Sequence, residues 1–199
     1  MELFWQDIRR MTEADARLWF SETDGPRQQQ LLRLRHPADR LRSLAGDHLA
    51  RQAVAAQSGL TPGEVVLART AQGKPYAVGL PVFFSISHSG SLVLCAADAS
   101  PVGADIQLVG PVSARLIGRV CTQRELAWVT GGTVLPPQVA DRSVLERFFT
   151  VWTEKEAWCK YTGEGLQGFF GTDTFALPEN LSMLHFRHED YAVALCRGR

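Results

Sequence analysis

The stretch VWTEKEAWCK, residues 151–160, decides how the second half of this chain folds. Apolar residues recur at helical spacing from about residue 142 to 161, and Gly163 then supplies a stop, so we predict one long helix. Trp152, Glu156 and Lys160 are four residues apart and therefore share one face of that helix. On so apolar a helix, this glutamate and lysine form either a solvent-facing ion pair beside a core tryptophan or part of a functional site.

A second carboxylate follows an apolar, β-branched run that is typical of a strand. The sequence VGADIQ, residues 102–107, places Asp105 where that strand would end. Taken alone, an aspartate there is most often a turn or cap residue. Together with Glu156 it would offer two oxygen ligands from different elements, the set that Mg²⁺ takes alongside waters and substrate phosphates. The small Gly103 would let a neighbouring backbone or ligand approach the strand closely.

The remaining pattern predicts an α+β protein. Helical spacing predicts helices over 12–20, 38–57 and 113–120, and Thr122 could cap a further short one. Strands are predicted over 65–68, 82–87, 92–97, 101–106, 172–177, 181–186 and 191–196, with a break at Asp24-Gly25-Pro26. In each half a long helix precedes three short strands. We therefore predict a pseudodimer of two similar halves, 1–100 and 101–199, each packing a long helix on a small antiparallel sheet.

Composition excludes several classes of function. Lys+Arg and Asp+Glu balance at 21 each, so no whole-chain field favours nucleic acid or an anionic membrane. No run approaches the roughly 20 apolar residues of a membrane span, and the N-terminus lacks the features of a signal peptide. The 4 cysteines are far apart in apolar surroundings, which favours buried free thiols over zinc or disulfides. We therefore expect a cytoplasmic protein that recognises charged partners only locally.

The motif FFSISHSG, residues 83–90, combines a strand end with a hydroxyl and an imidazole. Ser87 and His88 do not suggest a hydrolase pair, because adjacent residues of a strand point to opposite faces and no acid is placed to orient the imidazole. These groups and the nearby backbone amides suit a bound phosphate better. The motif is therefore interpreted as a phosphate-binding strand end.

These motifs occur in the order and approximate spacing of one enzyme family. Over about residues 31–197 the chain resembles the 4′-phosphopantetheinyl transferases of the surfactin-synthetase-activating type. The family pattern Trp-Ser-x-Lys-Glu-Ala-x-x-Lys is matched at Trp152, Lys155, Glu156, Ala157 and Lys160, with Thr153 in place of serine. Such enzymes are pseudodimers with the active site in the cleft between the halves, so the resemblance implies that architecture.

The resemblance also implies a Mg²⁺ site, with Mn²⁺ as an alternative ion. Asp105, Gln107 and Glu156 would be its ligands. Family members often carry glutamate at the position of Gln107, whereas an amide offers only a neutral carbonyl oxygen. The third coordination position therefore departs from the family pattern.

Three further side chains would act on the phosphates and on the incoming serine. Lys155 and Lys160 would contact the pyrophosphate or its bridging oxygen, and Lys160 would also stabilise the leaving phosphate. Either Glu125 or Glu156 through a water would accept the serine proton. Taken alone, Glu125 is an acid in the first turn of a helix, where it interacts favourably with the helix dipole.

The first half would hold much of coenzyme A. Arg42 and Ser43 match a segment at the 3′-phosphate, His88 would contact the same group, and Ser87 would contact the phosphates. Gly73-Lys74-Pro75 would line the adenine side. Without the resemblance, each basic residue here would be taken as a solvated side chain.

The implied reaction transfers 4′-phosphopantetheine from coenzyme A to a serine of an apo acyl or peptidyl carrier protein and releases adenosine 3′,5′-bisphosphate. Arg115 and Arg119, one turn apart, are candidates to meet the acidic carrier surface. We expect a monomer without nucleic-acid or membrane partners. The alternative is a non-catalytic protein that binds coenzyme A or a carrier domain, which Gln107 favours and the retained acids and lysines disfavour. A metal-dependent phosphohydrolase is a weaker third interpretation, since the sequence shows neither a nucleophilic-aspartate motif nor a His-rich metal site.

Overall fold

The computed structural model describes residues 1–71, 73–163, 165 and 172–199. The chain divides into two compact units, Met1–Pro101 and Val102–Arg199, and each has its own hydrophobic core. Within the described residues, no helix combines the length and the apolar composition that crossing a membrane requires.

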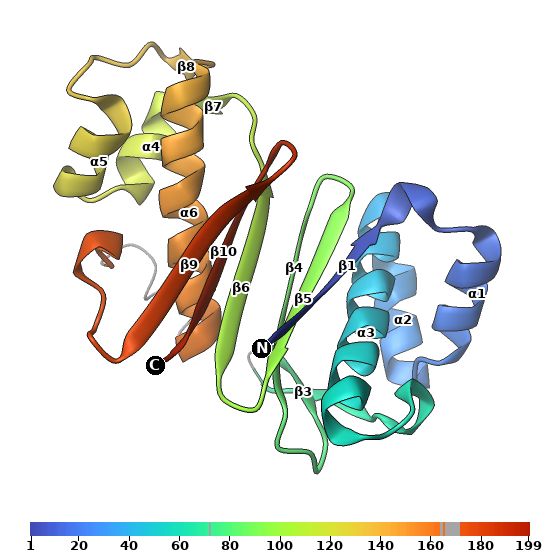
Figure 1. Cartoon of the computed structure of the whole chain (residues 1–199). Helices are drawn as coiled ribbons and strands as arrows, with labels where there is room; N and C mark the ends of the chain where they lie inside the picture. The colour runs from blue at the N-terminus through green and yellow to red at the C-terminus, as the bar shows by residue number, and fades with distance from the viewer. Residues whose placement is uncertain (72, 164, 166–171) are drawn as a thin grey trace. The chain divides into compact units, whose positions relative to one another are not determined.

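A three-stranded antiparallel sheet and one long helix form the centre of the first unit (Figure 1). Strand β1 (Glu2–Asp7) pairs with β5 (Leu92–Asp98), which also pairs with β4 (Phe83–Ser89). Helix α3 (Pro37–Ser58) packs on all three strands. The shorter elements are η1 (Ile8–Arg10), α1 (Glu13–Ser21), α2 (Gly25–Arg33), η2 (Pro62–Glu64), β2 (Leu67–Arg69) and β3 (Pro75–Ala77).

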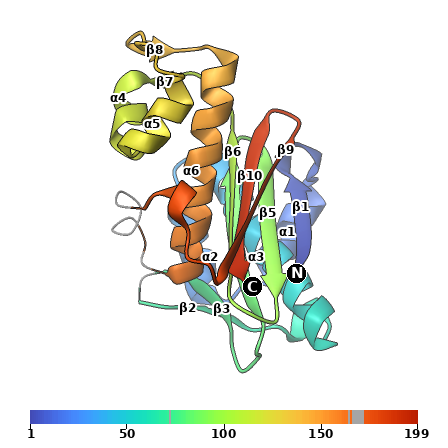
Figure 2. The same ribbon diagram turned by 60° about the vertical axis from the view of Figure 1, so that its left-hand side comes forward.

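The second unit has the same central arrangement. Strand β6 (Val102–Leu108) pairs with β10 (Tyr191–Gly198), which also pairs with β9 (Leu181–His188), and α6 (Arg142–Thr162) packs along this sheet. Figure 2 shows the shorter elements gathered around the N-terminal half of α6. They are β7 (Val112–Ser113), α4 (Ala114–Val120), α5 (Gln123–Thr130) and β8 (Gln138–Val139), and η3 (Thr174–Ala176) follows later in the chain.

The two sheets share one connectivity, which confirms the predicted α+β pseudodimer. In each unit the last strand lies between the first strand and the second-last, and the long helix precedes the final hairpin. The central strands β5 and β10 are buried along nearly their whole length, with a strand on each side and the long helix packed against the sheet. The same burial pattern thus occurs in both units.

Local signals set the helix boundaries that the sequence predicted. Thr12 forms a capping box at the start of α1, as Thr122 does for α5. Gly59 and Gly163 follow α3 and α6 in the left-handed backbone region, with φ of 72° and 79°, where only glycine avoids strain. The predicted helices over 12–20, 38–57, 113–120 and 142–161 are therefore confirmed to within about two residues.

Several elements differ from the prediction. Strands β1, β3, β7 and β8, the 3-10 turns η1 and η2 and helix α2 were not predicted, and residues 172–177 contain η3 in place of the predicted strand. The supposed break at Asp24-Gly25-Pro26 starts α2, because Asp24 caps the Arg27 backbone N–H and proline stands in the first turn. The second sheet is complete without residues 172–177, since β6 supplies its third strand.

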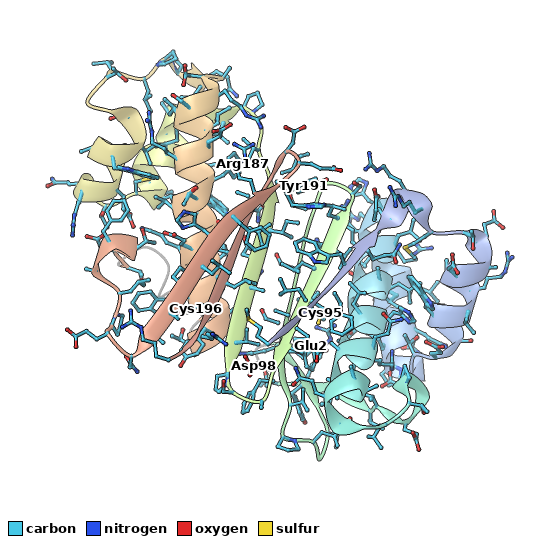
Figure 3. All side chains as sticks on the ribbon, viewed as in Figure 1. Glu2, Cys95, Asp98, Arg187, Tyr191 and Cys196 are labelled. Carbon is cyan, nitrogen blue, oxygen red and sulfur yellow. The ribbon has the colours of Figure 1, made fainter. Side chains whose placement is uncertain are left out.

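All four cysteines are free thiols, and three of them are buried as predicted, whereas Cys121 is only partly buried. Cys95 and Cys196 lie on the central strands of their sheets (Figure 3), and both are buried. Burial raises the pKa of the Cys121 and Cys196 thiols to about 12, so both stay protonated at neutral pH.

Candidate active site

Gly103 sets how closely α6 approaches the second sheet. A Cβ at this position would lie 1.9 Å from the Ala157 carbonyl oxygen and 2.6 Å from the Tyr161 backbone nitrogen, both on α6. Only glycine fits such a contact. The predicted close approach at Gly103 is thus confirmed, and its partner is the helix that carries Glu156 and Lys160.

Asp105, two residues further on, lies on the same face of β6 and is the centre of a polar cluster. It is 1% exposed. Lys160 Nζ donates to Asp105 Oδ1 at 2.6 Å, and Gln107 Nε2 donates to Asp105 Oδ2 at 3.3 Å. Burial raises the pKa of Glu156, and the charge of Asp105 raises it further against the opposing effect of Lys160. We call Asp105, Gln107, Glu156 and Lys160 the acid–lysine cluster.

The acid–lysine cluster has the donor set of a magnesium site that substrate completes. Two carboxylates and one amide supply hard oxygen atoms, and Mg²⁺ favours one or two carboxylates together with waters and phosphates. In the part of the chain that the structure describes, no three His, Cys, Asp or Glu side chains gather as a metal-binding group. The two acids repel each other, as the raised pKa of Glu156 indicates, and a cation would relieve that repulsion. The residues therefore fit Mg²⁺ bound with a phosphate ligand.

Lys155 and Glu125 are held in a different contact, inside the core of the second unit. Both side chains are 0% exposed, and Lys155 Nζ lies 2.7 Å from Glu125 Oε2. The ring of Trp152, on the same helix, packs edge-on against Phe148 with the centroids 5.8 Å apart. Of the three predicted catalytic residues, the structure brings Glu156 and Lys160 together with Asp105. It places the third, Glu125, in a buried pair with Lys155, which was predicted to contact the phosphates of coenzyme A.

In the first unit, Arg42 joins α3 to the turn after β4. Its Nη1 donates to the Gly90 carbonyl at 2.8 Å, and it pairs with Asp39 one turn before it. Ser87 is buried and His88 exposed, as expected for adjacent strand residues on opposite faces. Ser43 is half-buried on α3, next to Arg42. The structure therefore brings Arg42 to the turn that follows Ser87 and His88.

Gly73-Lys74-Pro75 forms the end of a tight turn between β2 and β3. The Thr70 backbone N–H donates to the Lys74 carbonyl at 2.9 Å, and Gly73 takes the left-handed conformation with φ of 85°. Burial lowers the pKa of the Lys74 ammonium. This segment thus ends in a hydrogen-bonded turn whose lysine side chain is partly buried.

A hollow of about 160 Å³ next to Pro75 holds basic residues that the sequence did not single out. Arg27, Arg51 and Arg69 line it with Asp47. The buried Asp47 carboxylate accepts from Arg27 Nε at 2.6 Å and from Arg69 Nη2 at 3.0 Å. Asp24 also lines the hollow, so two carboxylates face three guanidinium groups. The only sequence signal was Asp47, an aspartate among apolar residues of α3, which needs buried partners.

Comparison with known proteins identifies a family for each half of the chain. Residues 12–100 match the family model described as 4′-phosphopantetheinyl transferase, N-terminal, and residues 101–196 match that of the 4′-phosphopantetheinyl transferase superfamily. The chain belongs to the 4′-phosphopantetheinyl transferase superfamily. The two matches meet at residues 100 and 101, one residue before the boundary between the structural units.

Individual transferases are similar over much of the chain. A 4′-phosphopantetheinyl transferase of Bacillus subtilis is 33% identical over 141 residues, which is 70% of this chain and 60% of the relative. The Sfp transferase of Bacillus subtilis (strain 168) is 28% identical over 79% of this chain and 68% of its own length. The gsp transferase of Aneurinibacillus migulanus is 28% identical over 80% of this chain and 63% of its own length. The chain thus spans about two thirds of the length of these relatives.

Proposed function

We propose that this protein transfers 4′-phosphopantetheine from coenzyme A to a serine hydroxyl of an apo acyl or peptidyl carrier protein, with Mg²⁺. The observation that carries the proposal is the acid–lysine cluster, in which a close β6–α6 contact at Gly103 sets Asp105 beside Glu156 and Lys160. Two acids with a lysine suit a reaction in which a pyrophosphate is held and split.

In the proposed reaction the serine oxygen attacks the phosphorus that carries pantetheine. The bond from that phosphorus to the bridging oxygen breaks, and adenosine 3′,5′-bisphosphate leaves. Bound Mg²⁺, held by Asp105, Glu156 and the amide oxygen of Gln107, would supply charge stabilisation on the pyrophosphate. Lys160 donates a hydrogen bond to the leaving phosphate, and Glu156 accepts the serine proton, directly or through a water. We assign no chemical step to Glu125 or Lys155, because both are fully buried.

We assign the 3′-phosphate of coenzyme A to residues of the first unit. Arg42 and His88, with Ser43 and Ser87 beside them in sequence, are one candidate group, and the hollow with Arg27 and Arg69 is the other. The hollow has three arginines against two aspartates and lies next to Pro75, and both observations support it. Binding of coenzyme A and of its 3′-dephospho form to His88→Ala and Arg27→Ala distinguishes them: the group that reads the 3′-phosphate is the one whose loss abolishes the preference for coenzyme A.

We assign docking of the carrier to α4. Arg115 and Arg119 are exposed one turn apart, and α4 contains no acidic residue. Such a surface complements an acidic carrier domain. We also propose a cytoplasmic location and a monomeric state, and size-exclusion chromatography of the purified protein tests the monomer.

The experiment that tests the function mixes the protein with coenzyme A, Mg²⁺ and an apo carrier domain and measures the mass of the carrier. We expect a gain of one phosphopantetheine per carrier and equimolar release of adenosine 3′,5′-bisphosphate. Binding of coenzyme A without a mass gain, for any of several acyl and peptidyl carriers, would support the non-catalytic alternative instead.

A further inference from the structure

The Glu125 carboxylate has no free position for a proton or a substrate. Oε1 accepts from the Thr174 backbone N–H at 2.8 Å and from the Thr174 hydroxyl at 3.1 Å. Oε2 accepts from the Thr122 backbone N–H at 2.7 Å and lies 2.7 Å from Lys155 Nζ. A carboxylate offers about four acceptor positions, and these donors occupy them.

Lys155 is equally enclosed. It is 0% exposed, and its Nζ also donates to the Val120 carbonyl at 2.7 Å. That carbonyl belongs to the last residue of α4, which no longer has a partner within its own helix. The ammonium thus caps α4 from the side of α6 and at the same time neutralises Glu125.

The pair joins four segments of the second unit. Val120 ends α4, Thr122 caps α5, Lys155 lies on α6, and Thr174 begins η3. Removal of either charged partner leaves the other charge buried without compensation, which is strongly destabilising. The pair therefore fixes where α4, with Arg115 and Arg119, lies relative to the helix that carries Glu156 and Lys160.

We infer that Glu125 and Lys155 are positioning residues that hold α4 and η3 against α6, and that neither touches coenzyme A or the attacking serine. The inference rests on the proposed transferase function for its kinetic consequences only. It predicts that the pair affects use of the carrier, whereas the chemical step depends on the acid–lysine cluster.

A double-mutant cycle tests the inference with Glu125→Gln, Lys155→Met and the combination of both. Each single variant should lower the melting temperature by about 10 °C and raise the KM for carrier, and the double variant should recover part of both losses because no unpaired charge remains. At saturating carrier, kcat should stay within about threefold of wild type, and the acid limb of its pH profile should persist in Glu125→Gln. A fall in kcat of about 10²-fold with an unchanged melting temperature and no acid limb would overturn the inference, since a general base behaves in that way.

Amine labelling of the wild-type protein gives a second test that needs no variant to fold. The chain has lysine only at positions 74, 155 and 160. In the native protein without coenzyme A, acetylation followed by mass spectrometry should modify Lys74 and Lys160. Lys155 should be modified only after denaturation, and coenzyme A should not change its protection. Rapid labelling of native Lys155 that coenzyme A suppresses would identify it as a ligand of the substrate and overturn the inference. If the wild type transfers nothing, the proposed function fails, but melting temperatures and labelling still decide the role of the pair.

Discussion

Two lysine–carboxylate pairs on α6 share the same chemistry in opposite surroundings. Lys160 Nζ lies 2.6 Å from Asp105 Oδ1, and Lys155 Nζ lies 2.7 Å from Glu125 Oε2. The Lys160 side chain is 28% exposed, whereas that of Lys155 is 0% exposed. A short distance therefore does not distinguish a reactive pair from a structural one, and access to substrate does.

The glutamates beside the two lysines also differ in charge balance. Burial pushes the pKa of Glu125 upward, but hydrogen bonds from Lys155, Thr174 and Thr122 outweigh it and hold the pKa below its usual value. The pKa of Glu156 is raised by burial and by Asp105. The buried pair is thus balanced within the protein, whereas the acid–lysine cluster has negative charge that a cation from outside would balance.

Removal of Asp105 from the partly exposed acid–lysine cluster should have the largest effect on activity. Asp105→Ala deletes a proposed metal ligand and the partner of Lys160, so we expect kcat/KM for carrier modification to fall by about 10³-fold or more. Asp105→Asn, which keeps the shape but not the charge, should lose nearly as much. Circular dichroism and the melting temperature report whether the fold persists, and substantial activity in the alanine variant would refute the metal assignment.

A substitution at Gly103 should disturb the contact between β6, which carries Asp105, and α6, which carries Lys160. Gly103→Ala forces α6 away from β6 at Ala157, so we expect a loss of about 3 kcal/mol in unfolding free energy and a large loss of activity. Gly118→Ala is the matched control, because nothing lies within 4 Å of a Cβ there and alanine favours a helix by about 1 kcal/mol. Denaturant unfolding measures both. Equal stability of the two variants would mean that the β6–α6 contact is looser than the structure shows.

Most of the fold could be predicted because its signals are local. Capping residues such as Thr12 and stops such as Gly163 act within one turn, and the paired motifs around Asp105 and Glu156 identified the open cluster. Strand β1 escaped prediction because it is only partly buried and stabilised by pairing with β5, some ninety residues later in the chain.

The roles of buried charges could not be predicted, because their partners are distant in sequence. Lys155 meets the Val120 carbonyl 35 positions away, and Arg69 meets Asp47 22 positions away. Nothing in the local sequence separates Lys155 from Lys160, since both match the same family pattern. Burial alone assigns one to the core and the other to the site.

Arg115 and Arg119 of α4 should affect binding of the carrier but not of coenzyme A. Arg115→Glu with Arg119→Glu should raise the KM for carrier by about tenfold and leave the KM for coenzyme A nearly unchanged, because exposed charges act mainly on encounter. The difference between wild type and variant should shrink as salt is added. Steady-state kinetics at two ionic strengths measure it. Identical carrier kinetics in both proteins would leave these arginines as ordinary surface residues.

The smallest expected effect on activity concerns Gln107, the one neutral member of the acid–lysine cluster. Its amide nitrogen donates to Asp105 Oδ2 at 3.3 Å, and this hydrogen bond occupies a carboxylate oxygen that a cation could otherwise bind. We therefore expect the free protein to bind Mg²⁺ weakly and to acquire the ion mainly with coenzyme A, whose phosphates supply anionic oxygens. Gln107→Glu removes that hydrogen bond and adds a charge, so Mg²⁺ affinity without coenzyme A should rise by about tenfold, or about 1.4 kcal/mol. Turnover need not rise, since only interactions that are stronger in the transition state accelerate a reaction.

Calorimetric titration of Mg²⁺ into the wild type and Gln107→Glu, with and without coenzyme A, decides between the outcomes. Equal affinity in the absence of coenzyme A would show that residue 107 does not contact the ion, and the open cluster would then bind metal through Asp105 and Glu156 alone.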